Sequence, residues 1–477
     1  MKQLATAIFL LYSSAIWAQT GYEIKVTLKP FKNQYIYLGH YYGKQLPIID
    51  SVKLNDKSEA VFTGSKKLGG GIYLIGYPDR ANKFEFLIGA QQRFSIVADT
   101  TNMNKITFMG STENVSFKAY QEFMMQNGKA IESLNALRKG APKNDSLKLS
   151  SQIDSISRKV AAYRIALIAK EPNGLLTAML KGMREPEVPV NPEAVKKDSM
   201  YAYHYFKAHY WDGVAFYDDR LARTPFFEGR VDKYFEQLVY PSADSVIKEL
   251  DWMLGYASAS EEMQKFLLLK FVNRYLNQKY MWEDAVFVHL FEKYFAQKNY
   301  SWLTDKGKKM ITDRAYSLMA NIMGTPAAEI SLPDSNGKTM NLYGIESPYT
   351  MVVMYDPTCS HCKETLPKMD SLYQSKWKRM GVKLFAVAKQ TEGVKQQDWF
   401  DFLHKYGLKD WVHVYYSKEA EQARVAANTP SYSQLYDVQS FPTLYLLDKD
   451  KRIIAKKLTT QQVDEILEQR IKTGKAN

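Results

Sequence analysis

Cysteine use is the feature that most restricts this chain. Only two of its 477 residues are cysteine, Cys359 and Cys362, and they stand three positions apart. A disulfide between them closes a very small loop, and by chain entropy a small loop gives the least stabilisation. Proteins that rely on disulfides for stability usually carry several pairs that bridge distant positions. The chain must therefore be held together by buried apolar cores, and the two thiols indicate chemistry rather than structural support.

The composition supplies enough apolar material for such cores. Hydrophobic residues make up 45% of the chain and charged residues 24%, without the signature of disorder. A chain of this length predicts about three domains rather than one core. The formal net charge of +13 comes from lysines scattered among acidic residues, without a long basic run. This pattern indicates a solvated basic surface and does not predict a nucleic-acid partner.

The first residues have the pattern of an export signal. A charged start, Met1–Lys2, precedes the mostly apolar stretch from Leu4 to Trp17. That stretch is shorter than the roughly 20 apolar residues of a membrane span. It predicts a signal peptide, residues 1–18, cleaved after Ala18, with an uncleaved anchor or a first strand as the alternatives. We therefore expect an exported protein of the periplasm or cell envelope.

Changes in hydrophobic period predict three domains after the signal peptide. Residues 21–112 contain short alternating runs separated by turn-forming residues, which predicts a β-sandwich or barrel-like domain. Residues 114–322 have apolar residues at helical spacing, which predicts an all-α domain. Residues 325–477 alternate strand and helix patterns, as in βαβ units. The predicted fold class is multidomain: all-β, then all-α, then α/β.

The first two domains show no catalytic cluster. Within residues 201–220, His204 and His209 raise the question of a metal site, together with Asp212, Asp218 and Asp219. The two histidines are five positions apart and do not share one helix face, so an aromatic packing face or a docking surface is the favoured interpretation. We interpret both domains as a binding or assembly module that selects a client, dimerises, or holds the third domain at a distance. The oligomeric state stays open.

The two cysteines stand where a predicted buried strand, Thr350–Tyr355, passes into a predicted helix. A C-x-x-C motif in this context is typical of a thioredoxin-type redox pair. Cys359 would lie at the helix N-terminus, where unpaired N–H groups and the helix dipole favour negative charge and hence the attacking thiolate. Cys362, one turn on, would be buried and close enough to resolve a mixed disulfide. Cys359 is thus the predicted nucleophile and Cys362 the predicted resolving thiol.

Three local phrases resemble the thioredoxin-like family, especially its exported TlpA/ResA-type branch. They are "PDSNGKTMNL" before the cysteines, "YDPTCSHCKETLP" around them and "VQSFPTLYLLDKDKRI" after them, and the resemblance covers about residues 325–472. It implies a thioredoxin fold in which Pro442 is a cis-proline that faces Cys359. It also implies that Phe441 and Thr443 are substrate-docking positions. The preceding domains resemble, more loosely, uncharacterised β and helical domains of some envelope proteins, which implies no activity.

The chain departs from the family pattern near the cysteines. Thr358 stands where a tryptophan is usual, and Val353 stands where ordinary thioredoxin has a buried aspartate. Thr365 occupies a position that is often glutamate in the TlpA/ResA branch, whereas Pro367 matches the proline that kinks the active-site helix. These departures leave the proton acceptor for the resolving thiol open.

Four polar residues are candidates for supporting roles. Glu364 and Asp356 are the candidate proton acceptors. Ser360 and His361 lie between the cysteines and are predicted to tune the redox pair, because a histidine there stabilises the thiolate and makes the disulfide more oxidising. The alternative for His361 is an exposed helix residue without a role.

These features favour an exported thiol–disulfide oxidoreductase. It needs no bound cofactor, because the electrons reside in the Cys359–Cys362 pair, and its expected partners are envelope protein thiols or disulfides and a redox partner that resets it. The alternative is a copper or other metal carrier using Cys359, His361 and Cys362, although structural zinc wants four ligands. A peroxidase is disfavoured, since Asp356 stands where peroxiredoxins have threonine or serine. Whether the protein reduces, oxidises or reshuffles its clients stays open.

Overall fold

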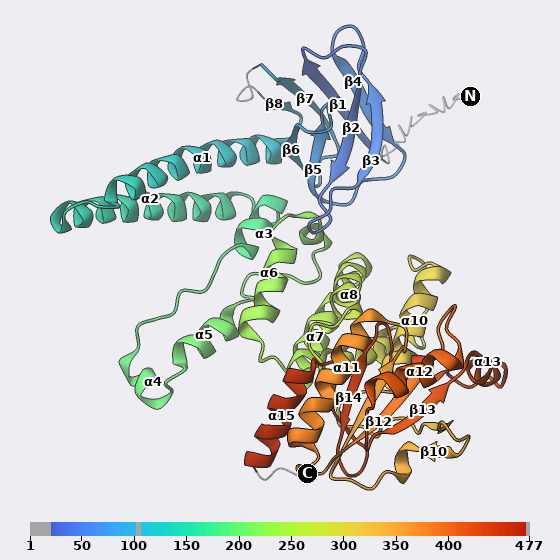
Figure 1. Ribbon diagram of the computed structural model, residues 1–477. Helices are drawn as coiled ribbons and strands as arrows, with labels where there is room; N and C mark the ends of the chain where they lie inside the picture. Colours follow the sequence, from blue (N-terminus) through green and yellow to red (C-terminus); the bar gives the residue numbers. More distant parts are fainter. Residues whose placement is uncertain (1–20, 102–105, 474–477) are drawn as a thin grey trace, which may run out of the picture. The chain divides into compact units, whose positions relative to one another are not determined.

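The computed structural model describes residues 21–101 and 106–473 of the chain (Figure 1). It divides into two compact units. One comprises Met1–Val239 and Trp252–Leu267, and the other Tyr240–Asp251 and Leu268–Asn477. The predicted signal peptide, residues 1–18, lies outside the described residues. None of the helices in the described part of the chain is long and apolar enough to cross a membrane.

Two four-stranded sheets open the first unit. Their strand orders are β4-β1-β7-β8 and β3-β2-β5-β6. Because alternate side chains of a strand point to opposite faces, each sheet contributes one apolar face to a shared core that includes Ile24, Val26 and Phe86. This arrangement confirms the predicted all-β class of the N-terminal region. The strands are β1 (Tyr22–Lys29), β2 (Tyr35–His40), β3 (Ile48–Lys53), β4 (Glu59–Gly64), β5 (Gly71–Gly76), β6 (Lys83–Ile88), β7 (Arg93–Asp99) and β8 (Thr107–Met109).

The central region is helical, as predicted. Figure 1 shows α1 (Thr112–Arg138) and α2 (Lys143–Lys170) side by side as a long hairpin. Phe117 of α1 and Leu175 of α3 (Leu175–Gly182) pack against Ile72 and Leu87 of the sandwich. The remaining central helices are α4 (Pro192–Lys197), α5 (Tyr201–His209), α6 (Phe227–Lys233), α7 (Ala243–Ala257), α8 (Glu261–Leu276), α9 (Glu283–Leu290) and α10 (Asp305–Met319).

The helical residues do not gather into one separate unit. Helices α1 to α6 belong to the first unit, whereas α9 and α10 belong to the second. The reason lies in their apolar and polar contacts: α1 and α3 pack on the sandwich, while α10 contacts the C-terminal α/β region. The last central helices are thus structurally continuous with the region that carries the cysteines.

A five-stranded sheet of order β13-β12-β11-β14-β15 forms the centre of the second unit. Its strands β11, β12 and β13 are parallel, and β14 and β15 run antiparallel to their neighbours. The sheet is covered on both faces, so Met351 and Val353 enter one core and Val352 and Met354 the other. This confirms the predicted α/β class. The sheet strands are β11 (Tyr349–Tyr355), β12 (Val382–Lys389), β13 (Val412–Tyr416), β14 (Thr443–Leu447) and β15 (Ile453–Lys456).

The helices around this sheet differ between its two faces. Residues of α11 (Ser360–Leu372), α12 (Gln396–Tyr406) and α15 (Thr460–Lys472) enter the core on the Met351 side. The other core contains residues of α14 (Tyr432–Leu435) and of the hairpin formed by β9 (Ser331–Pro333) and β10 (Thr339–Asn341). Asn336 and Gly337 lie in the turn between β9 and β10, and Gly337 has the positive φ of 80° that glycine adopts readily. The exposed helix α13 (Lys418–Ala426) was not predicted.

Candidate functional site

The two cysteines lie at the junction between β11 and α11. Cys359 is the N-cap residue of α11, it is partly exposed, and its side chain makes no capping hydrogen bond. Cys362 lies in the first turn and is fully buried, with 0% of its surface exposed. Both thiols are free. The junction therefore presents one sulfur to solvent at a helix N-terminus, where negative charge is stabilised, and keeps the other beneath it.

The environment of Cys362 favours its protonated form. Burial raises the pKa of this thiol well above its usual range, and the neighbouring Cys359 thiol raises the pKa further through its charge and a hydrogen bond. The backbone of Asp356 opposes the rise. Cys362 therefore needs help to lose its proton before it can act as a nucleophile.

Alkylation of the reduced protein is expected to distinguish the two thiols. In the folded protein, iodoacetamide should modify Cys359, which is partly exposed, and leave Cys362 unmodified, because Cys362 is buried and has a raised pKa. Mass spectrometry of the digested protein measures both sites, and the urea-unfolded protein provides the control in which both react. Equal modification of the two thiols in the folded protein would contradict this geometry.

The two predicted proton acceptors lie in different environments. Asp356 is buried, and its Oδ1 accepts hydrogen bonds from the Thr358 backbone N–H and hydroxyl group, each at 2.7 Å. Its Oδ2 accepts a 2.5 Å hydrogen bond from the Thr391 hydroxyl group. The negative charge of Asp356 contributes to the raised pKa of Cys362, which indicates that the two groups interact.

Glu364, by contrast, is exposed at the surface. Its carboxylate accepts a 2.7 Å hydrogen bond from Lys368, and this bond and the charge of Lys368 lower the pKa of Glu364. A carboxylate with a lowered pKa is a weaker base. Asp356 is thus buried near Cys362 and Glu364 is exposed and paired with Lys368, and the role of either residue as the proton acceptor stays a prediction.

The segment before β14 carries the third element of the predicted site. The Phe441–Pro442 peptide bond is cis. Pro442 and His361 line the same pocket, which has a volume of about 630 Å³. Thr443 also lines this pocket and donates a 2.6 Å hydrogen bond to the Ser440 carbonyl group, while Phe441 is partly buried against both cores of the sheet. The structure therefore brings His361 into one pocket with Pro442 and Thr443, which lie about 80 positions later in the sequence.

Ser360 and His361 are both exposed at the start of α11. Two further residues of the pocket wall, Asp437 and Lys457, were not predicted as site residues. They form an ion pair with each other. No spacing in the sequence signals this pair, because isolated charged residues are normally exposed and carry no functional meaning by themselves.

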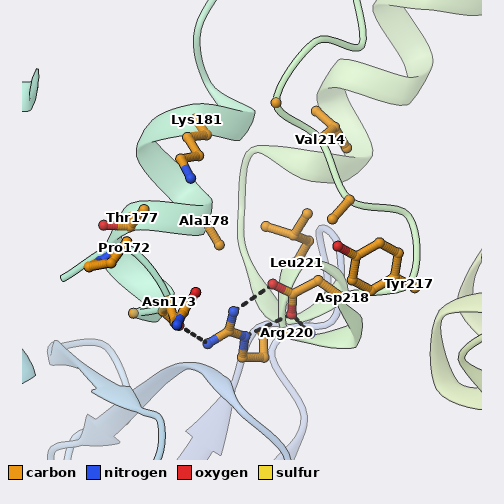
Figure 2. Close-up of a pocket in the computed structure, with 13 residues that line it drawn as sticks. Pro172, Asn173, Thr177, Ala178, Lys181, Val214, Tyr217, Asp218, Arg220 and Leu221 are labelled. Carbon is orange, nitrogen blue, oxygen red and sulfur yellow. Dashed lines mark hydrogen bonds and ion pairs between the residues drawn. The ribbon is translucent and has the colours of Figure 1, made fainter. Parts of the chain in front are cut away.

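A second pocket lies in the first unit, between α3 and the segment around Asp218 (Figure 2). It has a volume of about 500 Å³. The Arg220 guanidinium forms two hydrogen bonds with Asp218, at 2.7 and 2.6 Å, and a third at 3.3 Å with the Asn173 carbonyl group. Asp218 and Arg220 thus satisfy one another, so this pocket offers less for catalysis than the one lined by His361 and Pro442.

The histidines considered for a metal site are also paired separately. His204 hydrogen-bonds to Asp198 and His209 to Asp212, at 2.6 and 2.8 Å. Among the described residues, no group of three or more His, Cys, Asp or Glu side chains could hold a metal ion.

Comparison with known families identifies the region that contains both cysteines. Residues 323–456 match the AhpC/TSA family. The C-terminal α/β region is a thioredoxin-like domain of this family. A domain of unknown function, DUF5106, matches residues 143–320. The thioredoxin-like domain therefore includes the C-x-x-C motif and Pro442, and α10 lies in the uncharacterised domain.

Relatives of the thioredoxin-like domain have a common activity. A thiol-disulfide oxidoreductase ResA of Bacillus cereus is 28% identical over 148 residues, which are 31% of this chain and 75% of that protein. ResA of Bacillus anthracis is 25% identical over 146 residues, with the same coverage of 31% and 75%. A solved thioredoxin-like protein from Bacteroides caccae is 20% identical, with a TM-score of 0.42, and the match covers 60% of this chain and 97% of that one. The family and its curated relatives support an oxidoreductase activity of the thiol–disulfide class.

Proposed function

We propose that this protein is an exported thiol–disulfide oxidoreductase that exchanges disulfides with proteins of the cell envelope. The observation that carries the proposal is the paired placement of the two thiols, with Cys359 partly exposed at the start of α11 and Cys362 buried one turn on. The pocket shared by His361 and cis-Pro442 supports it, since it provides a surface for a client chain next to that helix.

The exchange balances without a bound cofactor. The Cys359 thiolate attacks one sulfur of a client disulfide, so that a mixed disulfide forms, the client S–S bond breaks, and the released client sulfur takes up a proton. Cys362 then gives up its proton and attacks the Cys359 sulfur, which releases the second client thiol and forms the Cys359–Cys362 disulfide. The client gains two electrons and two protons and the dithiol loses them. A dithiol protein that acts as redox partner restores the reduced state, and an oxidised pair runs the same steps in reverse.

The predicted export signal supports a location outside the cytoplasm. The apolar stretch from Leu4 to Trp17, followed by Ala18, has the pattern of a cleaved signal peptide. A dithiol in the periplasm or envelope meets clients that contain disulfides, because disulfides form and persist in such compartments. We therefore propose envelope proteins as the clients.

The direct test is disulfide exchange with insulin, together with equilibration against glutathione buffers. The reduced protein should accelerate insulin reduction over free dithiothreitol, and absence of any acceleration would overturn the proposed function. The equilibrium with glutathione gives the reduction potential of the Cys359–Cys362 pair. A value near that of thioredoxin, about −270 mV, indicates a reductant, whereas a value near that of DsbA, about −120 mV, indicates an oxidant.

His361→Ala is expected to make the disulfide harder to reduce. A histidine between the cysteines stabilises the thiolate and so the reduced state, and its loss should lower the reduction potential by about 30 mV, a tenfold change in the equilibrium constant. The same glutathione titration measures the shift. Ser360→Ala is the matched control, because it changes the neighbouring exposed residue and keeps the His361 imidazole. If the wild type and His361→Ala have equal reduction potentials, His361 does not tune the redox pair.

A further inference from the structure

The loop that leads to cis-Pro442 is anchored at a buried carboxylate. Asp437 stands five positions before Pro442. It is only 4% exposed, and its φ of 41° lies in the left-handed region, which few residues other than glycine adopt. After Asp437, Gln439 and Ser440 are exposed, and the loop has no regular structure before β14. The position of the loop therefore depends on what holds Asp437.

Side chains from three segments converge on the Asp437 carboxylate. Oδ1 accepts hydrogen bonds from Arg314 Nη1 at 2.6 Å and from Ser317 Oγ at 3.2 Å, both from α10. It also accepts one from Gln439 Nε2 at 3.1 Å, within the loop itself. Oδ2 forms an ion pair with Lys457, between β15 and α15. Burial acts to raise the pKa of Asp437, but the hydrogen bonds and charges of Lys457 and Arg314 outweigh it, so the pKa is lowered and the carboxylate stays ionised.

Arg314 is itself held in place. Its Nε donates a 3.2 Å hydrogen bond to the Leu276 carbonyl group, and its Nη2 donates a 2.6 Å hydrogen bond to Gln278 Oε1. Its side chain is only 13% exposed. With two of its nitrogens already held by these groups, Arg314 is a rigid donor, because little further freedom is lost when its third nitrogen binds the carboxylate.

Helix α10 makes additional contacts with the chain just before Asp437. Ser317 Oγ also lies 3.3 Å from the Gln434 carbonyl oxygen, a second acceptor within reach of its single hydroxyl proton. Asn321 Nδ2, just after the helix, donates to the Leu435 carbonyl group at 3.3 Å. The α10 segment thus holds residues 434–437 through both side-chain and backbone atoms. After Asp437 in the sequence, Gln439 and Ser440 of the loop line the same pocket as His361 and Pro442.

We propose that Arg314 and Asp437 are positioning residues for disulfide exchange, through which α10 sets the place of the cis-proline loop beside the reactive cysteines. The inference rests on the proposed function and extends it, because Arg314 lies in the domain of unknown function rather than in the thioredoxin-like domain. That domain then contributes to client binding through the position of this loop.

The test uses the full-length protein and a fluorescent peptide with one intramolecular disulfide. Arg314→Met and Asp437→Asn are each expected to lower kcat/KM for this peptide about tenfold, mainly through a higher KM, because small displacements of a positioning group are costly. The double variant should be no slower than the slower single variant, since both residues act through one contact. The alkylation rate of the Cys359 thiol should not change, because neither residue touches that sulfur.

Lys376→Met is the matched control. Lys376 pairs with Asp464 at 2.6 Å, and this pair joins α15 to the segment after α11 without contacting the loop. If the control lowers kcat/KM as much as Arg314→Met and Asp437→Asn do, the loss is a general stability effect and the inference is overturned. If Asp437→Asn does not fold, Ser317→Ala removes a single hydrogen bond to the carboxylate and should still raise KM; an unchanged KM overturns the inference. The wild-type protein is assayed before any variant. If it shows no exchange, the proposed function is refuted, which is a different outcome from failure of this inference.

Discussion

Replacing Cys359 with serine is expected to abolish disulfide exchange and to leave the fold intact. Serine cannot form a mixed disulfide, so the first covalent step is lost, and loss of a nucleophile commonly lowers turnover by several orders of magnitude. The fold should be unaffected, because the Cys359 side chain is partly exposed and makes no capping hydrogen bond to α11. Insulin reduction measures the activity, and circular dichroism with thermal unfolding measures the fold.

Cys362→Ser is the matched comparison, because it removes the other thiol of the same motif. Here Cys359 can still attack a client, but no second thiol releases the product, so the mixed disulfide should accumulate. Non-reducing electrophoresis of the variant incubated with an oxidised peptide detects the conjugate by its added mass. A conjugate formed by Cys359→Ser and absent from Cys362→Ser would reverse the two roles. Full activity of Cys359→Ser would refute the assignment of this dithiol as the active group.

The core of the site could be predicted because its signals are local. The buried strand β11, the cysteines after it and the start of α11 lie within one short segment, and a continuous apolar run followed by a helical pattern is readable in such a window. Gly407 ends α12 in the left-handed conformation, with a φ of 57°, as a glycine at a helix C-terminus commonly does. The cis bond at Pro442 came from resemblance to a family and not from spacing, because many X–Pro sequences are trans.

The anchoring network could not be predicted, because its partners are far apart in the sequence. Arg314 and Asp437 are separated by 123 positions and Asp284 and Lys456 by 172. A single arginine or aspartate in a polar stretch looks like an exposed surface residue until the fold brings its partner to it. Helix α13 was missed for a related reason: its sequence, "KEAEQARVA", buries no residue and therefore has no apolar face to detect.

The same limitation hid a buried ion pair in the second unit, which should be costly to break by removing one partner. Lys456 at the end of β15 pairs with Asp284 of α9, and its Nζ also donates to Asn321 Oδ1 at 2.7 Å. The two charged side chains are 2% and 4% exposed. Burial raises the pKa of Asp284 and lowers the pKa of Lys456, so each charge is costly unless the other is present. The pair fixes α9 to the edge strand of the sheet.

Lys456→Met is therefore expected to destabilise the second unit by about 3–5 kcal/mol, because it leaves the Asp284 carboxylate buried without a cation. Replacing both partners, with Asp284→Leu added to Lys456→Met, should restore most of that loss, since apolar side chains of similar volume remove the burial cost of both charges. Amide hydrogen exchange in β14 and β15 measures the effect within this unit, which a single melting temperature of a protein with two units does not.

Lys309→Met is the control, because Lys309 and Asp313 form an exposed pair on α10 whose loss should cost less than about 1 kcal/mol. If the double variant were as unstable as Lys456→Met, packing of the lysine chain rather than its charge would hold α9 to the sheet.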